Sequence, residues 1–302
     1  MSIQAATIDE HARRTIAERL RRVQEEISST IENPAADPVH DLRVAIRRAS
    51  QALRLFAGLL PPKEARRMRR GLKPALDAAG RARDLDVGAE LLQSVGLEGH
   101  HPLFSAMAAE RRKAVLALLG QLYLLQSEDV PLCWLPVLDR IAPSGEQAAD
   151  AARAALPPIA AEFFEAGRKT MARTPSPEKL HALRLAAKRF RYTLELWEPF
   201  YGAAYKIKLE SVRRIQSILG SRQDCAVMRE RLKPLSAVDA ALEAALRKVD
   251  ARAAGLERQF HRYWHAQFDA PGEQERWMRY LARRLAARRA PASAGTPRVP
   301  IK

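Results

Sequence analysis

Apolar residues recur every three or four positions along nearly the whole chain, which is the spacing of one face of an α-helix. In residues 8–31, for example, Ile16, Leu20, Val23 and Ile27 fall on one side of such a helix. The alternation of apolar and polar residues that is typical of β-strands is nearly absent. The pattern therefore predicts an all-α protein.

Prolines and glycines divide this pattern into successive elements. The predicted helices cover residues 8–31, 39–58, 63–80, 85–96, 102–126, 147–172, 178–198, 203–220, 224–233, 237–267 and 273–290. Two of the breaks fall at Gly80 and Gly220, and Asp84 and Asp224 are expected to cap the helices that follow and to orient an arginine. The Pro-rich residues 127–146 are predicted to form a hinge, and residues 291–302 a disordered tail.

The second half of the chain repeats the first. HDLRVAIRRASQALRLF at residues 40–56 aligns with HALRLAAKRFRYTLELW at residues 181–197, and the Gly80 and Asp84 region aligns with Gly220 and Asp224. A repeat of this length is typical of two helical units related by a pseudo-twofold axis. We therefore predict two tandem units, at about residues 5–126 and 147–267, followed by a basic helix at 273–290.

Each copy of the repeated helix has one apolar face and one cationic face. The apolar positions, which we predict to be buried, are Leu42, Ile46, Leu53, Phe56, Leu183, Leu194 and Trp197. His40, Arg43 and Arg47 follow at i, i+3 and i+7, within about 60° of one another around the helix. The second copy carries its cations in the same spacing, at His181, Arg184, Lys188 and Arg191. Because like charges on one stripe repel, the stripe makes physical sense if an external anion neutralises it.

The overall charge points to the same kind of ligand. The chain has 51 Lys and Arg against 35 Asp and Glu, which gives a formal net charge of +16. An excess of this size costs self-repulsion and indicates a polyanionic partner, namely nucleic acid, polyphosphate or an anionic membrane surface. A solvated basic surface without a ligand is the alternative. No run of about 18 apolar residues occurs, so no membrane span is expected.

The repeated motif H-x-L-R-x-x-x-[RK]-R, followed in each copy by a glycine and an R-D or Q-D pair, resembles the CHAD family (conserved histidine α-helical domain). The resemblance covers about residues 5–290. It implies one domain of two pseudo-symmetric four-helix bundles with a basic groove or pore between them, and inorganic polyphosphate as the ligand. No E-x-E-x-K motif of a fused triphosphate-tunnel domain occurs, so a stand-alone binding domain is expected.

The residues predicted to bind polyphosphate combine the two motif helices with cations that recur at matching places in both repeats. They are His40, Arg43, Arg47, Arg48, Arg54, Arg66, Lys73, Arg112, His181, Arg184, Lys188, Arg189, Arg191, Lys206, Arg213 and Arg252. Ser50 stands where the family often has a basic residue, and Arg54 on the same stripe can compensate.

Other functions find less support in the sequence. No nucleophile–base pair and no nucleotide-binding or hydrolase motif is present, so we predict a non-enzymatic protein that needs no cofactor. His261 and His265 lack a third ligand, so no metal site is expected. Nucleic-acid binding is the main alternative, although no helix-turn-helix, RRM or KH signature occurs.

The expected location follows from the cysteines and from the family resemblance. Cys133 and Cys225 are the only cysteines, and no signal-like segment opens the chain, which favours a reducing compartment. We therefore expect a cytoplasmic protein, either free or on the surface of polyphosphate or storage granules.

Overall fold

The computed structural model describes residues 6–172 and 176–283, and within them the chain folds into ten α-helices and two short 3₁₀ helices without a β-strand. The prediction of an all-α protein is confirmed. The first half contains α1 (Ile8–Glu32), α2 (Ala36–Leu55), α3 (Glu64–Ser94), α4 (Pro102–Ser127) and α5 (Leu135–Leu138). The second half contains α6 (Ala148–Met171), α7 (Pro177–Trp197), α8 (Ala204–Leu232), α9 (Ala240–Gln267) and α10 (Glu273–Ala282). The part of the predicted last helix beyond Arg283, and the predicted tail, lie outside the described residues.

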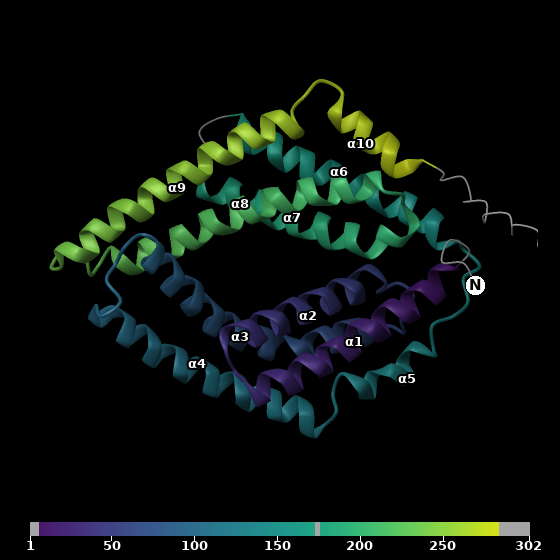
Figure 1. Ribbon diagram of the computed structural model, residues 1–302. Helices are drawn as coiled ribbons and strands as arrows, with labels where there is room; N and C mark the ends of the chain where they lie inside the picture. Colours follow the sequence, from purple (N-terminus) through teal and green to yellow (C-terminus); the bar gives the residue numbers. More distant parts are fainter. Residues whose placement is uncertain (1–5, 173–175, 284–302) are drawn as a thin grey trace, which may run out of the picture.

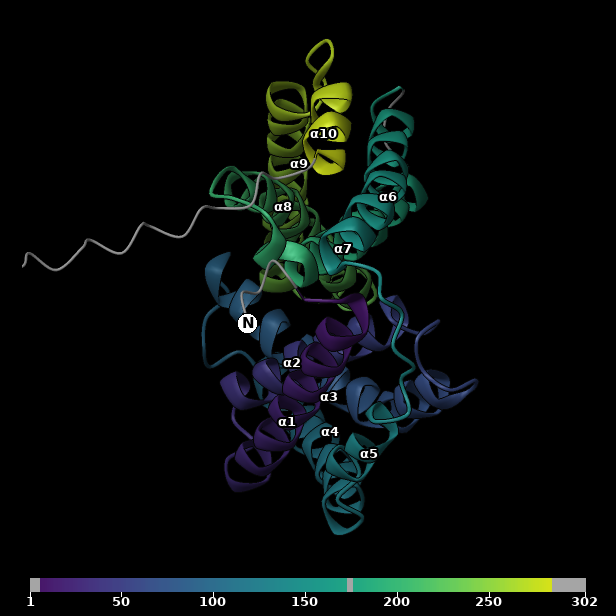
Figure 2. The ribbon, with the colours of Figure 1, turned by 90° about the vertical axis from the view of Figure 1, so that its right-hand side faces the viewer.

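The helices pack in the same order in both halves. In the first half α1 packs on α2, α2 on α3 and α3 on α4, while in the second half α6 packs on α7, α7 on α8 and α8 on α9. The short α10 packs on α6. Figure 1 shows the two halves as separate layers of long helices, and Figure 2 shows one half above the other. Within the described ranges, no helix combines the length and the apolar character needed to cross a membrane.

Two predicted helix breaks are wrong. Both α3 and α8 run without interruption through Gly80 and Gly220. Buried positions keep helical spacing through the first glycine, at Ala78, Ala79 and Ala82, and this packing outweighs the modest cost of one glycine inside a helix. Asp84 and Asp224 therefore lie in the middle of helices, where no free backbone N–H remains for them to cap.

The predicted apolar face is confirmed. All seven of its positions are buried: Leu42, Ile46, Leu53, Phe56, Leu183, Leu194 and Trp197. In the second half, a Cβ atom on Gly167 of α6 would overlap the ring of Trp264 from α9, so the glycine leaves room for the indole ring against α6.

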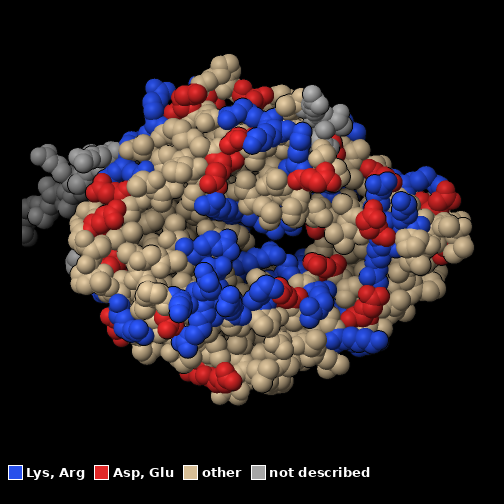
Figure 3. All heavy atoms as spheres, turned by 180° about the vertical axis from the view of Figure 1, so that it is seen from behind, with Lys and Arg blue, Asp and Glu red and all other residues tan. Residues whose placement is uncertain are grey.

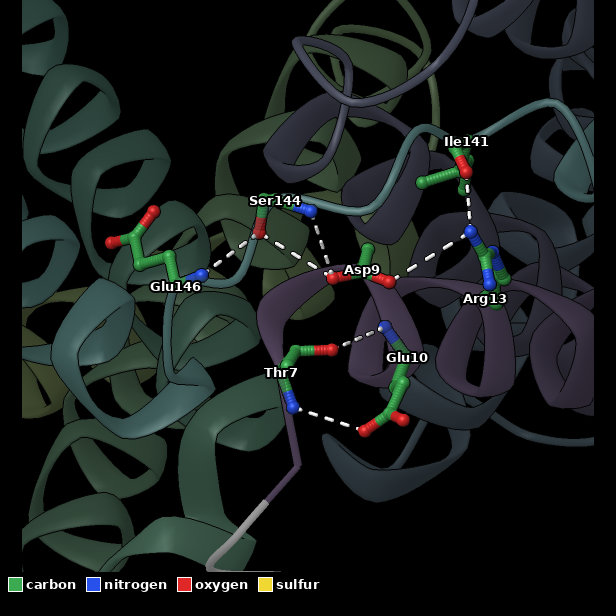
Figure 4. A network of polar contacts seen from close by, with 7 residues as sticks. All are labelled: Thr7, Asp9, Glu10, Arg13, Ile141, Ser144 and Glu146. Atoms are coloured by element: carbon green, nitrogen blue, oxygen red, sulfur yellow. Dashed lines mark hydrogen bonds and ion pairs between the residues drawn. The ribbon is translucent and has the colours of Figure 1, made fainter.

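The start of α1 ties the two halves together at one end of the molecule. Thr7 and Glu10 form a capping box at the N-terminus of α1, and Asp9 accepts hydrogen bonds from the backbone N–H and the hydroxyl of Ser144 (Figure 4). The backbone N–H of Ile8 donates to the carbonyl of Glu146 at 2.8 Å. The C-terminal end of the predicted hinge at 127–146 is thus hydrogen-bonded to the start of α1. Part of the hinge is helical, because α5 lies within it.

Next to this anchor, His11 of α1 is buried among aromatic rings of the second half. Its ring stacks on Trp197 with 5.3 Å between ring centroids and meets the edge of Phe200 at 4.7 Å. Burial lowers the pKa of His11 to about 4, so the ring is neutral and its Nε2–H donates to the carbonyl of Leu196 at 3.1 Å. The periodic pattern gave no reason to single out this residue.

At the other end of the molecule the halves share a second apolar cluster. Leu92 of α3, Met107 of α4, Met228 of α8 and Val249 of α9 are among its buried members. The two halves therefore touch at both ends, and α2 meets α7 between these ends.

Candidate functional site

Four cations from the two repeated helices converge where α2, α3, α7 and α8 meet. Arg43 and Arg47 come from α2, and Arg184 and Lys188 come from α7; we call these four residues the central cluster. They lie close enough for their charges to act on one another and on Asp84 of α3 and Asp224 of α8. Figure 3 shows an opening between the two halves with Lys and Arg side chains around it.

No carboxylate neutralises the central cluster directly. Among residues 6–172 and 176–283, no Asp or Glu oxygen lies within 4.0 Å of a charged nitrogen of Arg43, Arg47, Arg184 or Lys188. Asp84 and Asp224 act on Arg43 and Arg184 only at longer range. The Nε atom of Arg184 is buried and has no hydrogen-bond partner among the residues that the structure describes. The cluster therefore offers donors and positive charge that the described protein leaves unused.

The pKa values of Lys188 and Arg43 are lowered, which shows that the charged forms of these side chains are disfavoured when no anion is bound. Burial, followed by the charges of Arg184, Arg47 and Arg43, lowers the pKa of Lys188 to about 7. Burial and the charge of Arg47 lower the pKa of Arg43 to about 10. On the acidic side, burial raises the pKa of Asp224. A bound anion would reverse the first two effects, because it supplies the charge that the site lacks.

Gly80 shapes the cluster from α3. A Cβ atom at this position would lie 2.7 Å from Nη1 of Arg43, so any larger residue would force the guanidinium to shift away from the helix. The aligned Gly220 of α8 has no heavy atom within 4 Å of the corresponding point. The two repeats are therefore not equivalent at this site.

A hollow of about 530 Å³ adjoins the central cluster between α2 and α7. Arg47 and Lys188 of the cluster line it, together with Arg54, Tyr192 and the ion pair of Arg189 with Glu162. The hollow can take a chain of anionic groups that continues outward from the cluster.

Other predicted site residues are neutralised by the protein itself. Glu195 of α7, whose side chain is only 7% exposed, contacts Arg48 Nε at 3.3 Å, Arg213 Nη2 at 3.2 Å and Arg191 Nε at 3.7 Å. Arg189 pairs with Glu162, and Lys73 pairs with Asp77. Glu195 is not among the residues predicted from the sequence, although its position four residues after Arg191 on a helix is a signal for this pairing.

Comparison with known proteins identifies the family. The sequence model of the CHAD domain matches residues 14–233, which is most of the chain. The chain belongs to the CHAD family. Among solved structures, the CHAD domain from the plant Ricinus communis is similar with a TM-score of 0.64 and 21% identity over 94% of both chains. PptA from Streptomyces chartreusis is similar with a TM-score of 0.52 and 15% identity over 90% of this chain and 99% of that one. No curated protein matches the sequence.

In this CHAD domain, the remaining predicted residues lie outside the central cluster. His40 and His181 are exposed near the first turns of α2 and α7, one helical turn before Arg43 and Arg184. Arg66, Arg112 and Lys206 are exposed and have no ion pair in the described ranges. Arg252 donates a hydrogen bond to the hydroxyl of Ser94 at 3.3 Å. The fold thus brings together four of the sixteen predicted residues at the cluster and leaves these six at a distance from it or on the surface.

Proposed function

We propose that this CHAD domain binds inorganic polyphosphate without catalysing a reaction on it. The observation that supports this proposal most directly is the central cluster. Its four half-buried cations come from two repeated helices, and none of them has an ion pair with a carboxylate within residues 6–172 and 176–283. A polymer with a negative charge on every unit complements such a cluster better than a single small anion does.

The mechanism of binding needs only electrostatics and hydrogen bonds. The guanidinium groups of Arg43, Arg47 and Arg184 can each donate two parallel hydrogen bonds to phosphate oxygens, and Lys188 adds a point charge. Docking displaces the counterions that accompany both partners, so affinity should fall steeply as salt concentration rises. Because a longer chain engages more cations, affinity should also exceed that for orthophosphate.

A charge reversal tests the proposal. The double variant Arg43→Glu, Arg184→Glu should lose roughly a hundredfold or more in affinity for long-chain polyphosphate, because two charge-assisted contacts of about 1.5–3 kcal/mol each disappear. Titration calorimetry measures the affinity, and circular dichroism checks that the helices persist.

The matched control is Arg258→Glu, Arg262→Glu on α9, which changes the net charge by the same amount at two exposed arginines without ion pairs in the described chain. It should bind nearly as the wild type does. A folded Arg43→Glu, Arg184→Glu protein with wild-type affinity would refute the central cluster as the binding site.

Competition separates this proposal from its alternatives. Duplex or single-stranded DNA that displaces polyphosphate at physiological salt would favour a nucleic-acid-binding protein instead. Release of phosphate from polyphosphate or a nucleoside triphosphate in the presence of Mg²⁺ would contradict the non-catalytic part of the proposal.

A further inference from the structure

The two repeats differ in charge at several aligned positions beside the central cluster. Where α2 of the first repeat has Arg54, the aligned position of α7 is Glu195. The first turns of α3 contain Arg67, Arg69 and Arg70, whose aligned positions in α8 are Ile207, Leu209 and Glu210. The two repeats therefore share the arrangement of their helices but not the distribution of charged residues along them.

On the side of the first repeat, cations continue outward from the central cluster. Arg54 lines the same hollow as Arg47 and Lys188. Burial, followed by the charges of Arg69 and Arg189, lowers the pKa of Arg54, which places these three arginines close together. No ion pair involves Arg54, Arg69 or Arg70 in the part of the chain that the structure describes. In Figure 3, Lys and Arg side chains gather on the first half next to the opening between the halves.

On the side of the second repeat, carboxylates lie among the cations. Glu195 sits among Arg48, Arg191 and Arg213 and neutralises part of their charge. Arg213 also contacts Glu210 at 3.5 Å, and Ile207 presents an apolar side chain that is 74% exposed. Lys206 and Arg214 are cations on this side without an ion pair in the described ranges, but Glu198, Glu210 and Ile207 line the same hollow. A phosphate chain that continued in this direction would therefore meet acidic and apolar groups among the cations.

We propose that a polyphosphate chain held at the central cluster leaves it across the first repeat, where Arg54 and Arg69 bind its outer phosphates. This inference rests on the proposed function and adds a direction and an outer subsite to it. A short chain occupies the central cluster alone, whereas a long chain also reaches the outer subsite. The outer arginines therefore set the preference for chain length.

The test compares a long and a short ligand. In the variant Arg54→Gln, Arg69→Gln, the affinity for long-chain polyphosphate should fall by about tenfold or more, and the slope of log affinity against log salt should decrease by roughly two, since each lost phosphate contact removes about one. Tripolyphosphate should bind this variant as it binds the wild type. The control Arg258→Gln, Arg262→Gln on α9 removes the same charge and should change neither affinity.

The outcomes separate the two proposals. Unchanged affinity for the long chain in Arg54→Gln, Arg69→Gln would overturn the outer subsite, even if Arg43→Glu, Arg184→Glu still abolished binding. An equal loss in the α9 control would also overturn it, because the effect would then come from net charge alone. Retained binding of both ligands by Arg43→Glu, Arg184→Glu would instead refute the central site.

Discussion

At the scale of single residues, the central cluster differs from an ordinary basic surface because its charges are half-buried and unpaired. An exposed lysine or arginine keeps its hydration and has little reason to change its protonation. Lys188 instead has a pKa of about 7, because burial and three nearby arginines all disfavour its charged form. Phosphate groups beside Lys188 would favour the charged form and raise this pKa.

The first residue-scale prediction is that binding at the cluster takes up a proton. Below about pH 6 Lys188 is already charged in the free protein, so affinity should not depend on its protonation. As the pH rises through 7, the free protein loses this proton while the complex keeps it, so affinity for tripolyphosphate should decrease between about pH 7 and about pH 9.

The variant Lys188→Arg isolates this effect, because arginine stays charged throughout the range. The affinity of Lys188→Arg for tripolyphosphate should therefore decrease much less above pH 7 than that of the wild type. Calorimetry in buffers of different ionisation enthalpy measures the affinity and the proton uptake. A wild-type affinity that stays constant from about pH 6 to about pH 9 would show that Lys188 does not titrate on binding.

At the scale of helices, the uninterrupted α3 is what positions Arg43. A glycine in a sequence usually predicts the end of a helix. In the structure Gly80 lies inside the long helix α3, where the side chain of Arg43 packs against it. The guanidinium of Arg43 lies against the bare backbone, from which it can point toward the other cations of the cluster.

We therefore expect Gly80→Ala to weaken binding without weakening the fold. The added methyl group would displace the guanidinium of Arg43 and cost roughly tenfold in polyphosphate affinity, the equivalent of about 1.5 kcal/mol for one charged contact. Thermal unfolding should show unchanged or slightly higher stability, since alanine favours the helix.

Gly220→Ala in α8 is the matched control, because no atom lies within 4 Å of its added Cβ. It should raise the free energy of unfolding by about 0.5–1 kcal/mol and leave binding unchanged. Equal affinities of Gly80→Ala and Gly220→Ala would contradict the role assigned to Gly80.

At the scale of the whole molecule, the two halves are held together by contacts of different chemistry. His11 and its aromatic neighbours form one contact, the apolar cluster around Leu92 and Met228 forms another, and Glu195 joins Arg48 of the first half to Arg191 and Arg213 of the second. Gln51 Nε2 donates to Thr193 Oγ1 at 3.2 Å beside this carboxylate. These contacts fix the relative position of α2 and α7, and with it the geometry of the central cluster.

Glu195→Gln should therefore destabilise the junction between the halves. Three arginines would lose the carboxylate that partly neutralises them, and we expect the free energy of unfolding to fall by about 2 kcal/mol, less than for a fully buried pair because the arginines are partly exposed. Urea unfolding measures this change. The control Glu243→Gln, which breaks an exposed pair with Arg247 on α9, should cost less than about 1 kcal/mol. Equal costs would show that Glu195 acts as an ordinary surface carboxylate.

The sequence by itself determined the helices, the buried face, the internal repeat and the two cationic stripes. These features depend on residues a few positions apart, so helical periodicity makes them visible in the chain. Helical periodicity did not predict that α3 and α8 continue through their glycines. A glycine within a helix is tolerated when tertiary packing supports the helix, and this packing is not visible in the sequence.

Only the tertiary structure decided which cations stay unpaired. Arg43, Arg47, Arg184 and Lys188 meet one another, whereas Arg48, Arg191 and Arg213 meet Glu195. Arg48 and Glu195 are far apart in the sequence and are brought together by the packing of α2 against α7. The strength of an ion pair depends on distance and burial in space, and local periodicity carries no information about either.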